Sequence, residues 1–213
     1  MYFKVEQISK SLYGAEFNIV DTNGNKLGNV IVNGRMGTME VNVQINFIKD
    51  TIVLKYGYKN IKEAIKASFG KAIFRPYDVI VNNREDGRIG TQYIKQGMTS
   101  KIAVKELTLN ELKFESYFCG LGKEGQAYSI YTNETQIAQI NKNNEVINAL
   151  HKYEIKCIED KYVIPTLIEC IYIYVFSDYT PGEKIIKGKK VTIVNTTDKF
   201  LKSKYNANFW KEN

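Results

Sequence analysis

Hydrophobic and polar residues alternate one by one along much of this chain. Residues 41–47 are the clearest case, since every second residue is apolar and the residues between them are polar. A period of two places the apolar side chains on one face of a β-strand. Further strands are predicted within residues 15–20, 51–56, 101–118 and 153–158. Lys49-Asp50 is the predicted turn that brings residues 51–56 back onto residues 41–47.

A short helix is predicted at residues 60–69. Asn60 can cap its first turn by accepting a backbone N–H bond, and Gly70 can end it in a left-handed conformation. One face of this helix is apolar and carries Ile61, Ala64, Ile65 and Phe69. A second face, predicted to lie opposite Ile61 and Ile65, is basic and carries Lys59, Lys62 and Lys66.

A second helix is predicted at about residues 162–178, where the residues are apolar nearly all round. Asp160 is a candidate cap. Pro165 would lie in the first turn, where a backbone N–H has no partner within the helix, so that the missing N–H of proline costs little stability. A buried strand is the alternative, but strands usually end by about eight residues. The apolar run of about 14 residues is shorter than the roughly 20 that cross a membrane, so we expect burial inside the protein.

Three segments share one pattern, at residues 17–30, 78–90 and 128–140. Each has a strand, a polar turn, an aliphatic residue, a small residue and the start of another strand. Asn23-Gly24 and Asp86-Gly87 are the predicted turns, and the small residues are Gly28, Gly90 and Ala138. Generic hairpins can also look alike. As a structural repeat, such hairpins could lie side by side around the apolar helix and close into a barrel.

Hairpins of this form, followed by an apolar helix, resemble the tubby C-terminal-like superfamily, which includes the LURP-one-related proteins and the phospholipid scramblases. The resemblance covers roughly residues 1–179 and implies a closed antiparallel β-barrel of about twelve strands around the hydrophobic helix. Tubby domains bind phosphoinositides through basic residues on the barrel surface. The calcium-binding and Cys-rich segments of the scramblases have no counterpart here. Residues 180–213 extend beyond the family's pattern, and we expect this basic extension to dock on the barrel.

Residues typical of catalysis are scarce. His151 is the only histidine, which leaves few options for triads or zinc sites, and we expect it at the surface or at a strand edge. Cys119, Cys157 and Cys170 have no metal-ligand spacing, and Cys119 and Cys170 are predicted to be free, buried thiols, as expected in a reducing, cytoplasmic compartment. The sequence therefore predicts no enzyme, no cofactor and no metal site.

Glu169 is the one acidic residue within the apolar helix. It is either a functional carboxylate with a raised pKa or a structural one. In the structural case we expect it to pair with a lysine, to accept tyrosine hydroxyls or to reach the mouth of the barrel.

The net charge is +7, from 30 Lys and Arg against 23 Asp and Glu. A lysine-rich surface can serve solubility alone, but it also favours anionic partners. Two clusters are candidate ligand-binding sites. The first holds Lys55, Lys59, Lys62, Lys66, Lys71 and Arg75, and the second holds Lys184, Lys187, Lys189 and Lys190.

The function predicted first is a non-enzymatic module that binds anionic phospholipid, or another phosphate-bearing ligand, at the periphery of a membrane. The alternative is a structural or protein–protein interaction domain in which the charge is incidental. Single-stranded nucleic-acid binding ranks lower, and rests on Tyr56 and Tyr58 beside Lys55 and Lys59.

Overall fold

The computed structural model describes residues 1–11, 13–34, 41–96, 100–142, 145–147, 150–178, 189–191 and 194–212. Twelve antiparallel strands form one closed β-barrel, as predicted. The barrel strands are β1 (Tyr2–Lys10), β2 (Gly14–Val20), β3 (Lys26–Gly34), β4 (Val41–Phe47), β5 (Asp50–Tyr56), β6 (Phe74–Val81), β7 (Arg84–Gln96), β8 (Ser100–Leu109), β9 (Leu112–Gly122), β10 (Gln126–Thr132), β11 (Thr135–Lys142) and β13 (Lys152–Cys157). The barrel closes because β9 pairs with β10, and β11 pairs with β13, which in turn pairs with β1.

The alternation of residues along each strand decides which side chains fill the barrel. In β4, Val41, Val43, Ile45 and Phe47 are at most 4% exposed, whereas Asn42 and Gln44 are exposed. The turn after β4 is formed by Ile48 and Lys49, so Asp50 already belongs to β5 and the predicted turn is one residue late.

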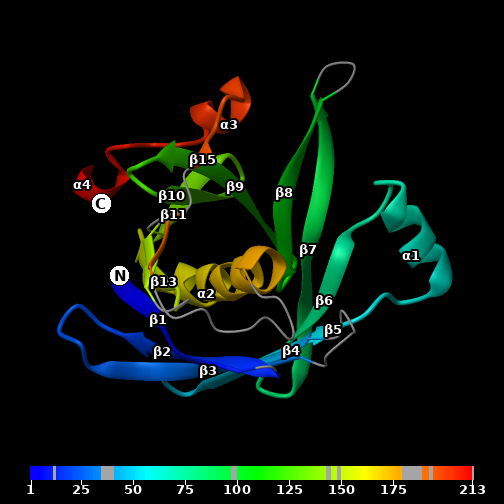
Figure 1. Cartoon of the computed structure of the whole chain (residues 1–213). Coiled ribbons are helices and arrows are strands. Elements are labelled where there is room, and N and C mark those ends of the chain that lie inside the picture. The colour runs from blue at the N-terminus through cyan, green and yellow to red at the C-terminus, as the bar shows by residue number, and fades with distance from the viewer. Residues whose placement is uncertain are drawn as a thin grey trace.

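Among the described residues, one helix occupies the barrel interior (Figure 1). It is α2 (Val163–Ile173), which follows the 3₁₀ turn Asp160–Tyr162 and continues into a π-helical turn, Tyr174–Asp178. Ten of its eleven residues are buried, as the apolar run predicts, so the buried-strand alternative is wrong. The predicted cap at Asp160 is wrong as well, because the 3₁₀ turn separates this residue from the first turn of α2. Within the described residues, no helix is long and apolar enough to cross a membrane.

The three predicted units are all hairpins, namely β2–β3, β6–β7 and β10–β11. Each has a β-bulge in its second strand, where one extra residue directly precedes a small residue that faces an aliphatic one. The facing pairs are Ile19 with Gly28, Val79 with Gly87, and Ile130 with Ala138. The predicted turn at Asp86-Gly87 is therefore wrong. The small residue that corresponds to Gly28 and Ala138 is Gly87, and the prediction of Gly90 for this position is wrong as well. Asn82 and Asn83 form that turn, and Gly87 packs against the backbone of Thr108 on β8.

The C-terminal part of the chain lies outside the barrel wall (Figure 1). A short pair is formed by β12 (Glu145–Ile147) and β14 (Lys189–Val191), and β15 (Val194–Asn195) pairs with the end of β9. The helices α3 (Lys199–Ser203) and α4 (Phe209–Glu212) follow. Phe209 is 2% exposed, and Trp210 contacts Tyr2 with ring centroids 5.4 Å apart.

Candidate functional site

The short helix α1 (Ile61–Ser68) lies outside the barrel, between β5 and β6 (Figure 1). The side chain of Asn60 accepts the Glu63 N–H at 3.0 Å, and the Glu63 carboxylate accepts the Lys59 N–H at 2.6 Å. At the other end, the Gly70 N–H donates to Ala67 O at 2.9 Å, and the Lys71 N–H donates to Lys66 O at 2.8 Å. Gly70 has a φ of 67°, as predicted. Both ends of this short helix are therefore capped.

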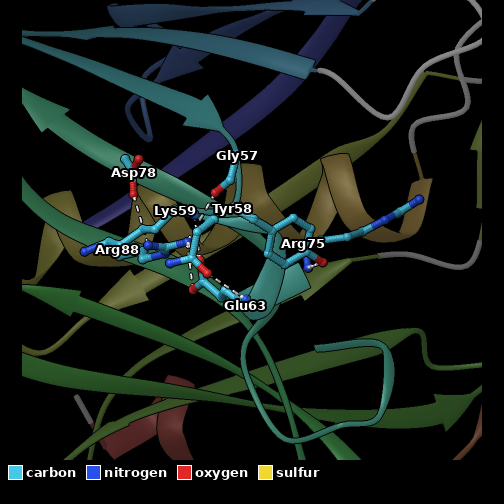
Figure 2. A network of polar contacts seen from close by, with 8 residues as sticks. Gly57, Tyr58, Lys59, Glu63, Arg75, Asp78 and Arg88 are labelled. Carbon is cyan, nitrogen blue, oxygen red and sulfur yellow. Dashed lines mark hydrogen bonds and ion pairs between the residues drawn. The ribbon is translucent and has the colours of Figure 1, made fainter. Parts of the chain in front are cut away.

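A polar clamp fixes α1 against the barrel wall (Figure 2). Arg88 of β7 lies 3.0 Å from Glu63 and 3.7 Å from Asp78. Its guanidinium also donates to Gly57 O at 3.2 Å. The Arg88 and Glu63 side chains are only 13% and 21% exposed, so this ion pair is partly shielded from solvent. The clamp turns the Glu63 side of α1 towards the barrel, and Ala67 is buried on that side.

The opposite side of α1 leaves large apolar side chains in solvent. Ile61 is 77% exposed, Ile65 is 53% exposed and Phe69 is 70% exposed. At about 100° per residue these three form one stripe, and Lys62 and Lys66 lie directly beside it. The predicted opposition between lysines and isoleucines is therefore wrong. Lys59 precedes the helix altogether.

Two lysines that sequence analysis did not select complete this surface. The Lys101 ammonium on β8 lies 3.5 Å from the position that a Cβ would occupy at Gly70. Lys95 on β7 pairs directly with Lys101, so both side chains project from the same side of the hairpin. We define the α1 face as Lys62, Lys66, Lys71, Lys95 and Lys101 together with Ile61, Ile65 and Phe69; all eight side chains are exposed.

The remaining residues of the first predicted cluster lie apart from the α1 face. Lys55 is exposed on the barrel wall, opposite Asp78. Arg75 donates to Phe176 O at 3.3 Å and lies 5.5 Å from the centre of the Phe176 ring, so it is committed to the end of the central helix. Figure 2 shows the Arg75 side chain pointing away from the Glu63–Arg88 clamp.

The second predicted cluster is only partly described. Lys184 and Lys187 lie outside the described residues. Lys189 and Lys190 belong to β14, where their backbones pair with Ile147 and Val146.

The predicted aromatic platform beside the lysines is occupied by contacts within the protein. Tyr56 contacts the rings of Tyr58 and Tyr77, at 6.2 and 5.3 Å between centroids. The Tyr58 hydroxyl also accepts the Arg75 N–H at 3.2 Å. Tyr56 and Tyr58 are only half-buried, but they support the base of the α1 connection instead of forming a free stacking surface.

Inside the barrel, Glu169 is completely buried and interacts electrostatically with Lys105 of β8. Neither Glu169 oxygen has a hydrogen-bond partner among the described residues, so the predicted hydrogen bonds from tyrosine hydroxyls are wrong. Complete burial contradicts the predicted position at the barrel mouth. The predicted pairing with a lysine is present only as an attraction between the charges of Glu169 and Lys105. Burial raises the pKa of Glu169 to about 8, while the Lys105 charge opposes the rise. Burial also lowers the pKa of Lys105, whose ammonium lies over the rings of Tyr128 and Phe176 at 5.5 and 5.4 Å. Both side chains are therefore buried, Glu169 on the central helix and Lys105 on the barrel wall.

His151 is buried, so its predicted surface position is wrong. It lies at the end of the central helix, where its Nδ1 is 4.0 Å from the Asp178 carboxylate. Asp178 also accepts from Lys142 at 2.6 Å and from the Tyr153 hydroxyl at 2.8 Å. The ring of His151 contacts Tyr174 at 5.6 Å between centroids. The histidine thus belongs to a packed polar network that joins β11, β13 and the π-helical turn.

The sequence matches no protein-family model, no curated protein and no solved structure. The resemblance to the tubby C-terminal-like superfamily therefore stays a prediction.

Proposed function

We propose that this chain is a non-enzymatic binding module, which binds anionic phospholipid or another phosphate-bearing ligand through the α1 face. The observation that carries the proposal is the group of five exposed lysines gathered around α1. Glu63 is the only acidic residue of the helix, and Arg88 holds it on the barrel side. Near an anionic bilayer, each lysine contributes about 1 kcal/mol of attraction.

The placement of the titratable groups supports binding over catalysis. The α1 face presents lysines and apolar side chains. Glu169 and Lys105, whose pKa values burial shifts towards the neutral forms, are 0% and 5% exposed inside the barrel. A substrate in solvent would not reach them in this conformation. The tubby-like resemblance supports the same function, since tubby domains use a basic barrel surface for phosphoinositides.

A protein–protein interaction domain is the second candidate, and the exposed Ile61, Ile65 and Phe69 favour it. The two functions differ in their dependence on salt. Attraction between lysines and phosphates weakens as ionic strength rises, whereas contacts through an apolar patch do not.

Co-sedimentation with vesicles tests the proposal. We expect the protein to bind vesicles that contain phosphatidylserine, to ignore pure phosphatidylcholine vesicles, and to bind less at physiological salt than at low salt. The double variant Lys62→Gln/Lys66→Gln should bind about thirtyfold less, because about 1 kcal/mol is lost with each charge.

The matched control is Lys26→Gln/Lys49→Gln, which removes the same charge from exposed lysines. Lys49 lies just before the first residue of β5, whereas α1 follows the last residue of β5. The control position Lys49 is therefore at the opposite end of this strand from the α1 face. A fourfold variant at Lys184, Lys187, Lys189 and Lys190 tests the second cluster. If the protein binds neither acidic vesicles nor a soluble polyphosphate, the proposal is rejected and pull-downs for a protein partner follow.

A further inference from the structure

We infer that the partner of the α1 face is a lipid bilayer, and that Ile61, Ile65 and Phe69 enter the region between its headgroups and acyl chains. The inference rests on the proposed function and deepens it, since lysines alone would serve equally well for a soluble phosphate compound. A soluble phosphate compound would not explain why Ile61, Ile65 and Phe69 are exposed beside the lysines.

The stripe is exposed because specific contacts turn α1 this way. An amphipathic helix at a protein surface normally packs its apolar side on the core. Here the Glu63–Arg88 ion pair and the buried Ala67 face the barrel instead. Caps at both ends stabilise the helical backbone itself, on which these orienting contacts depend. The helix is thus fixed with its apolar side outward.

Clustering sets this stripe apart from other exposed apolar residues. Ile48 and Leu112, which are 70% and 52% exposed, each lie in or next to a tight turn of the barrel. Single exposed apolar residues of this kind are ordinary. On α1, three such side chains follow one another within about 12 Å of helix, a length that can lie in the plane of a bilayer surface but cannot span it.

The surrounding lysines decide between a bilayer and a protein as the partner. Lysine is depleted from protein–protein interfaces, because its flexible, strongly hydrated ammonium is costly to bury. At a bilayer surface the same side chain lays its methylene stem along apolar groups and keeps its charge among the phosphates. Five lysines beside three apolar anchors therefore fit an anionic lipid surface.

The Lys95–Lys101 pair gives independent support. Like charges directly opposite each other destabilise a pair of strands. These two lysines face each other at the end of the β7–β8 hairpin, next to the C-terminal end of α1. A shared anionic partner removes this repulsion, so lipid phosphates are expected to seat around both ammonium groups.

A fluorescent label at a single introduced cysteine measures insertion. Cys119, Cys157 and Cys170 are all buried, and burial raises the pKa of Cys157 to about 11, so labelling favours an exposed new thiol. We compare an environment-sensitive dye at Phe69→Cys with the same dye at Ile48→Cys, because both native side chains are 70% exposed. With phosphatidylserine vesicles, the dye at position 69 should shift to the blue and be quenched by acyl-chain quenchers. The dye at position 48 should do neither.

Two further variants separate insertion from charge. Ile65→Ser/Phe69→Ser should lower vesicle partitioning by on the order of tenfold or more while leaving binding of soluble polyphosphate unchanged. Ile48→Ser should match the parent protein. Thermal unfolding of the double variant should be unchanged, since both residues are exposed, which excludes misfolding as the cause.

The outcomes distinguish the two proposals. If the lysine variant loses binding while Ile65→Ser/Phe69→Ser binds vesicles like the parent and the dye stays unshifted, the ligand is a phosphate group only. Insertion is then wrong and the proposed function stands. If neither vesicles nor polyphosphate bind, both fail. If the dye at position 69 shifts without lipid as protein concentration rises, the stripe contacts a second copy of this chain, and insertion is again wrong.

Discussion

At the scale of single residues, Glu169 shows how the barrel interior changes the chemistry of a side chain. The carboxyl group is fully buried without a hydrogen-bond partner among the described residues, and its pKa rises from 4.5 to about 8. The folded protein therefore binds more protons at this residue than the unfolded chain between these two pH values. The free energy of unfolding therefore falls as the pH rises from 4.5 to about 8. Above that range, the folded protein carries the full free-energy cost of ionising this buried carboxyl group.

We predict that Glu169→Gln flattens this dependence. Glutamine has nearly the same shape and no proton to lose, so the variant should gain stability relative to the parent as the pH rises from 4.5 to 8, by on the order of a few kcal/mol. Urea unfolding at several pH values measures the difference. The control is Glu16→Gln, which removes an exposed carboxyl group. Parallel pH curves for the parent and Glu169→Gln would show that Glu169 is already ionised at neutral pH.

At the scale of elements, one lysine among three aromatic rings contributes to holding the C-terminal segment on the barrel wall, together with the β15–β9 pairing and the Trp210–Tyr2 contact. The Lys204 ammonium lies 5.0 Å from the ring centre of Tyr117, 4.6 Å from that of Tyr131 and 5.5 Å from that of Phe200. The Tyr131 hydroxyl also donates to Lys204 O at 3.0 Å. Because Phe200 belongs to α3 and the two tyrosines belong to the barrel, the lysine joins the segment to the wall.

We predict that Lys204→Met loosens α3 and α4 while leaving the barrel intact. Methionine keeps a long apolar side chain but removes the attraction to the rings, which is worth about 1–2 kcal/mol when partly shielded. Hydrogen exchange should become faster in residues 199–212 and stay unchanged in β1 to β8. Lys202→Met, which alters an exposed lysine of the same segment, is the matched control. Equal exchange in the variant and the parent would mean that the rings do not hold the segment.

Some of these elements can be predicted from the sequence and others cannot. Strands such as β4 are predictable because a strand with one face in the core must alternate, and α2 is predictable because it is apolar all round. The outward orientation of α1 is not, since it depends on Arg88, which lies 25 residues from Glu63. Lys95 and Lys101 reach the site only through the pairing of β7 with β8. The prediction of a turn at Asp86-Gly87 is wrong because Asn82 and Asn83, which precede it in the hairpin, also adopt a positive φ and form the turn.

At the scale of the whole molecule, the barrel and α2 depend on each other. The wall has inward-facing apolar side chains all round, and α2 fills the space that they enclose. A closed sheet without this helix would leave a large cavity, and the helix alone would leave its apolar surface in water. The two parts are therefore expected to unfold together, although they are far apart in the sequence.

We predict that Ile168→Ala destabilises the entire barrel. Ile168 is 0% exposed on α2, and truncating such a core residue costs about 2–5 kcal/mol. Because α2 contacts strands from different parts of the wall, the loss should lower the urea midpoint of every probe by the same amount. Far-UV circular dichroism reports on the strands, and Trp210 fluorescence reports on the segment docked beside Tyr2. Ile8→Ala, the same change at a 50% exposed position of β1, should shift the midpoint little. If the strands kept their signal after tertiary packing was lost, barrel closure would not depend on α2.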